Sequence, residues 1–217
     1  MKTINLGQSN SILNRFIAEL RDKSIQKDSM RFRRTLERIG EIFAYEISKT
    51  LNYSAKEVTT PLGIANCSVP DENLVLATIL RAGVPLHNGM LNIFDKAQNA
   101  FVAAYRKYGK DNKFTIQIEY ISSPSIEGKI LVMADSMLAT GSSLVLAYEK
   151  LCEKGEPAHT HIVCPVASEF SLGYLSKHLP HKKVTLWVAA VDEELTNKSF
   201  IVPGIGDAGD LAYGNKL

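Results

Sequence analysis

One group of residues that could bind a charged ligand follows the apolar segment 130–134. Asp135 comes directly after this segment, and the small residues Thr140–Ser143 follow shortly after, in front of a predicted helix. Gly141 lets the backbone approach a ligand closely, and the first N–H groups of a helix carry partial positive charge. We therefore predict a phosphate cradle at Thr140–Ser143, with Asp135 accepting hydrogen bonds from sugar hydroxyls. The simpler alternative is a strand-to-helix turn with a serine as N-cap.

Arg81 is a second residue that could bind an anion. It follows the apolar segment 74–80 and precedes Ala82 and Gly83, so it is predicted to lie where a buried strand ends. A guanidinium donates paired hydrogen bonds to phosphate, and Gly83 permits an unusual backbone conformation beside it. The alternative is an ordinary surface arginine in a turn.

A third segment, Phe200–Asp210, is rich in glycine near the end of the chain. Gly204, Gly206 and Gly209 match the spacing G-x-G-x-x-G, but only eight residues follow Gly209. That is too short for the helix, second strand and acidic residue of a dinucleotide-binding unit. We interpret the segment as an irregular loop whose exposed amides could contact the edge of a flat polar ring. The alternative is a structural C-terminal tail.

A fourth segment, Tyr105–Gln117, carries Arg106 and several lysines between two predicted strands. Such a loop could close over an anionic substrate, although a mobile surface hairpin fits the same residues. The five histidines are scattered along the chain, and their spacing supports neither a Ser/His/Asp set nor a metal site. We therefore expect no metal ligands from the protein and no catalytic histidine.

These four segments need a scaffold that brings them together. Apolar runs of strand length alternate with helical periodicity, which is typical of a parallel β-sheet covered by helices on both faces. In such sheets ligands bind beyond the carboxyl ends of the strands, where Arg81 and Asp135 are predicted to lie. We predict one domain, residues 1–217. The predicted strands are 74–80, 100–105, 114–121, 129–134, 161–166 and 184–191, and the predicted helices are 9–23, 28–51, 86–94, 142–154 and 172–178.

The overall composition argues against several classes of protein. Of the 217 residues, 45% are hydrophobic and 22% are charged, which excludes disorder over most of the chain. The net charge of +2 and the lack of a basic stripe argue against nucleic-acid binding. The sequence has no run of about 18 apolar residues and no apolar signal core, so we expect a cytoplasmic protein without membrane association. The three separated cysteines suggest buried, reduced thiols.

The motifs resemble those of the uracil phosphoribosyltransferase family. The family pattern Ile-Leu-Arg-Ala-Gly is intact at Ile79–Gly83. The family's phosphoribosyl loop, Asp-Pro-Met-Leu-Ala-Thr-Gly-Gly-Ser, is matched by Asp-Ser-Met-Leu-Ala-Thr-Gly-Ser-Ser at Asp135–Ser143. The C-terminal pattern Pro-Gly-Leu-Gly-Asp-Ala-Gly-Asp is matched by Pro-Gly-Ile-Gly-Asp-Ala-Gly-Asp at Pro203–Asp210. Order and spacing fit across essentially the whole chain, and the C-terminal pattern is specific to the uracil branch.

The resemblance implies an enzyme of pyrimidine salvage that converts uracil and 5-phosphoribosyl diphosphate to UMP and pyrophosphate, with Mg²⁺ on the diphosphate. It also implies the phosphoribosyltransferase fold, with a small hood and an N-terminal helical arm. A homodimer or higher homo-oligomer is expected, to which the apolar helix 28–51 could contribute. Asp207 and Arg81 would be catalytic. The residues that would bind 5-phosphoribosyl diphosphate are Arg81, Arg106, Asp135, Ser136, Met137, Leu138, Ala139, Thr140, Gly141, Ser142, Ser143 and Asp207, and those that would frame uracil are Ile201, Gly206, Asp207 and Ala208.

Three departures from the family pattern affect this site. Ser136 replaces a proline, which should loosen the loop, and Ser142 replaces a glycine, so its side chain must fit beside the phosphate. Residues 107–113 replace an acidic stretch, so the hood over the diphosphate should differ. Two alternatives remain open. One is a phosphoribosyltransferase for another base, against which the intact Gly206–Ala208 argues. The other is a regulator that binds UMP or 5-phosphoribosyl diphosphate without turnover.

Overall fold

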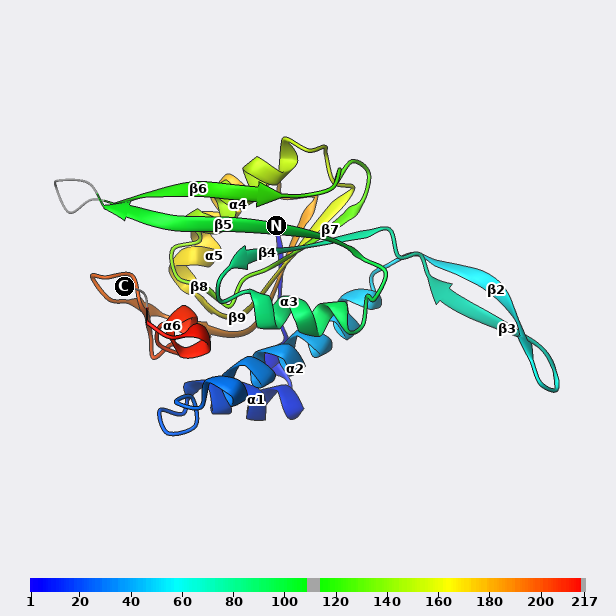
Figure 1. Cartoon of the computed structure of the whole chain (residues 1–217), viewed down its shortest axis with the longest axis horizontal. Helices are drawn as coiled ribbons and strands as arrows, with labels where there is room; N and C mark the ends of the chain where they lie inside the picture. The colour runs from blue at the N-terminus through cyan, green and yellow to red at the C-terminus, as the bar shows by residue number, and fades with distance from the viewer. Residues whose placement is uncertain (109–113, 216–217) are drawn as a thin grey trace.

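A central β-sheet with helices on both faces forms the body of the protein (Figure 1). The computed structural model describes residues 1–108 and 114–215. The strands of the sheet are β1 (Lys2–Asn5), β4 (Leu74–Leu80), β5 (Gln98–Tyr108), β6 (Phe114–Ser122), β7 (Ile130–Ala134), β8 (Met137–Leu138), β9 (His159–Ser168) and β10 (Val184–Asp192). Their order is β1-β10-β9-β7-β4-β5-β6, with β8 paired to β9. These pairings are parallel except for β5 with β6, so the predicted parallel sheet has one antiparallel edge.

Two groups of helices cover the two faces of this sheet (Figure 1). The helices are α1 (Ile12–Arg21), α2 (Ser29–Ser48) and α3 (Val84–Leu91) on one face, and α4 (Ser142–Cys152) and α5 (Glu169–His178) on the other. The side chains of β7 alternate between the two cores. Leu131 and Met133 pack on the side of α4 and α5, whereas Val132 and Ala134 pack on the side of α1, α2 and α3. A strand buried on both faces has no polar side, which explains its continuous apolar run.

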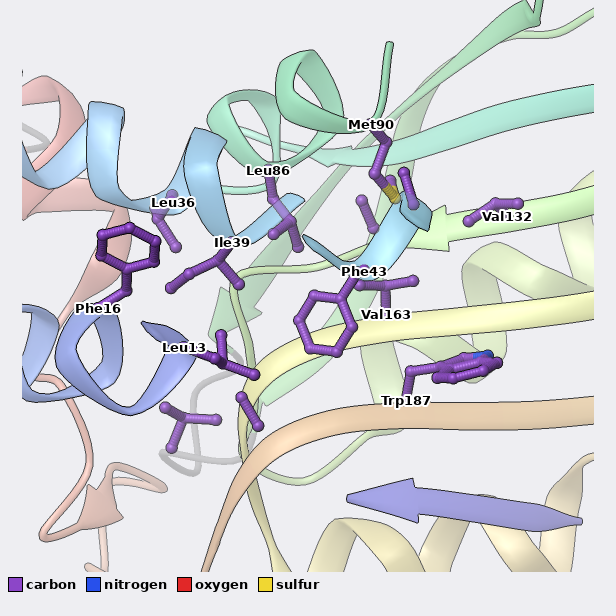
Figure 2. Packing of buried hydrophobic residues seen from close by; sticks show 14 of the residues in the cluster. Leu13, Phe16, Leu36, Ile39, Phe43, Leu86, Met90, Val132, Val163 and Trp187 are labelled. Atoms are coloured by element: carbon purple, nitrogen blue, oxygen red, sulfur yellow. The ribbon is translucent and has the colours of Figure 1, made fainter. Parts of the chain in front are cut away.

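The predicted helix 28–51 is α2, and its apolar face fills the centre of one core (Figure 2). Leu36 and Phe43 of this face are completely buried. They belong to one cluster with Leu86 of α3 and Trp187 of β10. The N-terminal helices are therefore part of the main core and not a loose appendage, which allows them to hold other segments in fixed positions.

The structure confirms every predicted strand and helix, with ends shifted by a few residues. For example, α3 begins at Val84 rather than at residue 86, because Pro85 suits the first turn of a helix. The C-terminal region differs more. There β11 (Glu194–Leu195) and β12 (Ile201–Val202) form a two-stranded sheet, and α6 (Ala208–Tyr213) follows. Near the N-terminus, the short helix η1 (Leu6–Gln8) lies between β1 and α1. Among the described helices, none combines the length and apolar character needed to cross a membrane.

A hairpin formed by β2 (Tyr53–Thr60) and β3 (Gly63–Pro70) projects from the body and was not predicted (Figure 1). Its residues are mostly exposed, and Leu62 at the turn is fully exposed. Because neither face of the hairpin is buried against the core, its sequence lacks the alternation that marks a half-buried strand. Cys67 on β3 is exposed, so the prediction of a buried thiol is wrong there.

Candidate active site

Two neighbouring strands bring Arg81 and Asp135 to the same edge of the sheet. β4 and β7 are parallel neighbours in which Thr78 pairs with Ala134, and Arg81 and Asp135 follow the ends of these strands. Gly83 is required where the chain turns into α3 above them. A Cβ atom on Gly83 would lie 2.4 Å from Thr78 Oγ1 and 2.8 Å from Ala134 O. The structure therefore confirms that the two motifs meet at the carboxyl ends of these strands.

The loop between β7 and α4 has the features predicted for a phosphate cradle. Gly141, with a φ of 79°, is the N-cap of α4, so the alternative of a serine N-cap is wrong. A Cβ atom on Gly141 would lie 2.2 Å from Cδ1 of Leu175, which shows how tightly α5 packs against the loop. The hydroxyls of Thr140 and Ser142 share a hydrogen bond of 2.7 Å, so the Ser142 side chain turns toward Thr140. These features place Thr140–Ser143 at the N-terminus of α4, the part of a helix that favours anions.

The first half of the same loop is fixed by β9. Met137 and Leu138 form the short strand β8, which pairs with the end of β9, and Ser168 Oγ donates a 2.5 Å hydrogen bond to Ala139 O. Ser136 and Leu138 are buried, with exposed fractions of 1% and 2%. The side chains of these two residues therefore pack inside the protein and stabilise the loop, and only their backbone groups could contact a ligand.

The Asp135 carboxyl has an unusual pKa because of its position. Burial raises its pKa from 3.8 to about 7, although the backbone N–H groups of Met137 and Ser136 donate hydrogen bonds that lower it. The family's proline at position 136 would have no N–H to donate. Ser136 therefore adds a hydrogen bond to Asp135 at the position where we expected a looser loop. A carboxyl with a pKa near 7 changes charge near neutral pH.

The C-terminal glycine-rich segment forms a short hairpin, a turn and a helix, where we predicted an irregular loop. Gly206 has a φ of 80°, and Asp207 is the N-cap of α6. The Asp207 carboxylate accepts a 3.1 Å hydrogen bond from the N–H of Asp210. Ile201 and Ala208 are buried, whereas Gly206 and Asp207 are exposed. The segment thus presents exposed groups between two buried anchor points.

The structure joins Arg81 to this C-terminal segment. Arg81 Nη2 lies 3.0 Å from Asp210 Oδ1, and Arg81 Nη1 donates to Gly214 O at 3.2 Å. Asp207 lies beside the pair, since a Cβ atom on Gly209 would be 3.3 Å from Asp207 Oδ1 and 3.5 Å from Arg81 Nη2. Arg81 Nε is buried without a hydrogen-bond partner in the described part of the chain. The Arg81 guanidinium is thus paired with the Asp210 carboxylate, in the neighbourhood of Asp207, and its Nε donor has no partner among the described residues.

Part of the predicted site lies outside the described residues. Arg106 belongs to β5, but its side chain and residues 109–113 of the predicted closing loop are not described. Two hollows between described residues contain none of the predicted site residues. A cavity of about 270 Å³ is lined by Gly7, Leu13, Asn14, Ile17, Ala18 and Ala189, and a groove of about 410 Å³ is lined by Ile12, Phe16, Arg38, Glu41, Ile42 and Tyr45.

The charged residues that hold the C-terminal segment were not predicted from the sequence to have this role. Arg21 of α1 and Asp192 of β10 both bond to Gly204, and Arg33 of α2 bonds to Ala212 O. The position of Asp192 could have marked it as a candidate, because it is an acidic residue directly after the predicted strand 184–191, just as Asp135 is an acidic residue directly after the predicted strand 129–134. Arg21 and Arg33 carried no such signal, since their partners lie 183 and 179 positions away in the sequence.

Known proteins resemble this chain along nearly its whole length. A sequence profile described as "Uracil phosphoribosyltransferase" matches residues 8–215. A uracil phosphoribosyltransferase of Porphyromonas gingivalis is 55% identical over 217 residues, 100% of both chains. One of Pyrococcus furiosus is 36% identical over 204 residues, 93% of this chain and 85% of the relative. The structure of the AQ2163 protein from Aquifex aeolicus has a TM-score of 0.87 at 29% identity, with 99% of each chain covered. The chain belongs to the uracil phosphoribosyltransferase family.

Proposed function

We propose that this chain transfers the 5-phosphoribosyl group from 5-phosphoribosyl diphosphate to uracil, giving UMP and pyrophosphate. The observation that carries the proposal is the meeting of three motifs beyond the carboxyl ends of β4 and β7. They are the loop Asp135–Ser143, Arg81, and the C-terminal segment 201–210. The substrates present a sugar phosphate, a pyrophosphate and a flat base. Each of the three motifs has the chemistry to bind one of these groups.

The phosphoribosyl group binds at the loop after β7. The N–H groups and hydroxyls of Thr140–Ser143 receive the 5-phosphate at the start of α4, where the helix dipole favours negative charge. Asp135, in its ionised form, accepts hydrogen bonds from the ribose hydroxyls. Resemblance also assigns Ser136–Ala139 to this group. Of these, Met137–Ala139 fix the conformation of the loop through their contacts with β9.

Arg81 binds the pyrophosphate group. Its side chain is 37% exposed, and its guanidinium exchanges the contact with Asp210 for phosphate oxygens when substrate binds. Arg106 is assigned to the same group by resemblance alone.

Uracil binds between Ile201 and the start of α6. The exposed backbone at Gly206 and the N-terminus of α6 at Ala208 face the two carbonyls and the N–H of the ring edge. A base with a different pattern of donors and acceptors would leave groups in the site unpaired, which strongly disfavours it. This arrangement selects uracil over cytosine without a charged side chain at the ring edge.

The reaction requires positioning and charge stabilisation more than a strong base. The bond from the ribose C1 atom to the pyrophosphate oxygen breaks as positive charge builds on the ribose. Uracil N1 attacks C1 from the opposite face, and its proton passes to solvent. Arg81 stabilises the departing pyrophosphate, and the Asp207 carboxylate, which lies beside Arg81, stabilises the positive charge on the ribose.

Mg²⁺ is expected on the diphosphate, and the residues present fit an ion held mostly by substrate oxygens and water. Within residues 1–108 and 114–215, no three His, Cys, Asp or Glu side chains are grouped to hold a metal. Mg²⁺ usually keeps several waters and binds through one or two carboxylates together with substrate phosphates. The sequence predicted no metal ligand from the protein; in the structure, Asp207 and Asp210, near Arg81, are the carboxylates that would nevertheless be placed to contact the ion. When bound, the ion neutralises part of the charge on the diphosphate.

A homodimer or higher homo-oligomer in the cytoplasm remains our proposal for the assembled enzyme, as the resemblance implies. The apolar face of α2 is not free to form a subunit contact, because Leu36 and Phe43 are buried in the core of their own chain. The large apolar side chains that α2 exposes are Met30 and Tyr45. A subunit contact through α2 therefore uses its outer side.

A pyrophosphate-release assay tests the proposed reaction. Purified protein, Mg²⁺ and 5-phosphoribosyl diphosphate are incubated with uracil, cytosine, hypoxanthine or orotate, and the nucleotide product is identified. We expect release with uracil only, together with UMP. Release with another base would overturn the assigned specificity. No release with any base, combined with measurable UMP binding, would indicate a regulator that binds without turnover.

A further inference from the structure

An ion pair between α1 and the end of β10 lies beneath the turn that leads into the proposed uracil site. Arg21 Nη2 is 2.7 Å from Asp192 Oδ1, and Arg21 Nη1 is 2.8 Å from Asp192 Oδ2, so the pair is bidentate. The Asp192 side chain is only 7% exposed and that of Arg21 is 25% exposed. Charge-assisted, bidentate contacts of this kind fix geometry more strongly than single neutral hydrogen bonds.

The same two side chains hold both polar groups of one glycine. Arg21 Nη1 donates to Gly204 O at 3.0 Å, and the N–H of Gly204 donates to Asp192 Oδ2 at 3.0 Å. Gly204 has a φ of 57°, and a Cβ atom there would lie 2.2 Å from Ile201 O. The ion pair therefore fixes the tight turn directly between Ile201 and Gly206, two of the four residues proposed to frame uracil.

Further contacts from the N-terminal helices extend this support along the C-terminal segment. Gln26 Nε2 donates to Leu20 O at 2.7 Å and lies 3.4 Å from Ile205 O. Arg33 Nη1 donates to Ala212 O at 2.6 Å, at the end of α6. The turn at Gly204 nevertheless differs from these points, because both of its backbone groups bond to charged side chains.

We propose that Arg21 and Asp192 are positioning residues for uracil: they hold the Gly204 turn so that the groups at Ile201, Gly206 and Ala208 match the ring edge. This proposal rests on the assignment of uracil to those residues. It predicts a selective effect, because the phosphate loop at Asp135–Ser143 has its own supports on β9 and α5. Loosening the turn should weaken uracil binding and base discrimination while leaving 5-phosphoribosyl diphosphate binding nearly unchanged.

The test compares Arg21→Lys and Asp192→Asn with the unchanged enzyme. Lysine keeps the positive charge but cannot make the bidentate contact, and asparagine keeps the shape of the carboxylate without its charge. We expect the KM for uracil to rise about tenfold in each variant, with the KM for 5-phosphoribosyl diphosphate within about twofold. The ratio of kcat/KM for uracil to that for cytosine should also fall. Equal rises in both KM values, or no rise for uracil, would overturn the proposal.

Glu19→Gln is the matched control for a merely structural effect. Glu19 lies on α1 close to Arg21, its side chain is 8% exposed, and it pairs with Arg15 and Arg31 at 3.1 and 3.0 Å. This variant should lower Tm and leave the two KM values in their original ratio. A selective rise of the uracil KM in Glu19→Gln would contradict the proposed role, because any damage to α1 would then have the same effect.

Two more variants separate this proposal from the site assignment on which it rests. Gly206→Ala adds a methyl group in ordinary van der Waals contact with Leu211 Cδ1 and Gln26 Oε1, at 3.6 and 3.8 Å, but strains the backbone at a φ of 80°. If it raises the uracil KM while Arg21→Lys and Asp192→Asn do not, the role of the ion pair is wrong and the uracil assignment stands. If it leaves the uracil KM unchanged, the uracil assignment itself is wrong. Should Asp192→Asn fail to fold, Gln26→Ala, which loosens the same turn at Ile205, is expected to show a smaller selective rise.

Discussion

The phosphate loop at Asp135–Ser143 and the C-terminal segment at 201–210 are held in place by different parts of the protein. The phosphate loop is supported by its neighbours in the sheet, since β8 pairs with β9 and both Ser168 and Leu175 contact the loop. The C-terminal segment is held by Arg21 and Arg33 of the N-terminal helices. In the proposed site, sugar-phosphate binding would therefore depend on contacts within the sheet, whereas base binding would depend on contacts between the N-terminal helices and the C-terminal segment.

The two regions also differ in the chemistry that shapes them. The phosphate loop relies on a left-handed glycine, neutral hydroxyls and the half-buried Asp135, whose pKa is raised to about 7. The C-terminal segment relies on the bidentate pair of Arg21 with Asp192. Steric changes and pH should therefore act mainly on the first region, and changes to the N-terminal helices mainly on the second.

Gly141→Ala is expected to give the largest difference between the effect on the phosphate loop and the effect on the C-terminal segment. The added methyl group would lie 2.2 Å from Leu175 Cδ1, on a residue whose φ is 79°, so the cradle must shift. We expect kcat/KM for 5-phosphoribosyl diphosphate to fall by about 100-fold. Gly173→Ala on α5 is the matched control, because no atom lies within 4 Å of its added methyl group. A similar loss in both variants, measured by steady-state kinetics, would contradict the proposed cradle.

A smaller effect is expected from Arg81→Ala, which removes the ion pair between the end of β4 and the C-terminal segment. The loss of a charged hydrogen-bond donor should reduce kcat/KM for 5-phosphoribosyl diphosphate by about 10- to 100-fold. The change in Tm should be small, because the Arg81–Asp210 pair is about one-third exposed. Arg34→Ala, which breaks an exposed pair with Glu37, should leave activity unchanged. Parallel losses of Tm and activity in Arg81→Ala would argue for a structural role only.

The smallest effect is a pH dependence confined to the phosphate loop. Because the Asp135 pKa is about 7, the carboxylate is mostly protonated below neutral pH. The KM for 5-phosphoribosyl diphosphate should therefore rise as pH falls below 7, by up to about tenfold at one pH unit below the pKa. Asp135→Asn should flatten this dependence. Since the pKa is raised in the folded state, Asp135 also makes the protein less stable as pH rises from about 4 to 7.

Two variants at Ser136 test which group sets the Asp135 pKa in the same pH measurement. Ser136→Pro removes the backbone donor that lowers the Asp135 pKa, so the midpoint of the KM profile should move to higher pH. Ser136→Ala keeps the N–H and should leave the midpoint in place. A midpoint that moves equally in both variants would show that the hydroxyl of Ser136, rather than its N–H, acts on Asp135.

Local patterns predicted the elements that have a buried face. The apolar run at 130–134 predicted β7, and the spacing of Leu36, Ile39 and Phe43 predicted the buried face of α2, because burial imposes a period on the residues that face a core. The same reasoning failed for the hairpin 53–70, which has no buried face and therefore no period. It also missed α6, because a six-residue helix is too short for a periodic signal.

The apolar patterns and the glycine turn predicted the succession of the main strands and helices, the strand-end positions of Arg81 and Asp135, and the strand-to-helix loop at Gly141, because these depend on burial periods and on glycine in a local turn. Which distant side chains meet could not be predicted from the sequence. The contact of Arg81 with Asp210, the pKa of Asp135, and the hold of Arg21 and Asp192 on Gly204 depend on packing between segments far apart in the chain. Such contacts leave no local pattern, because the folded core alone fixes their distances.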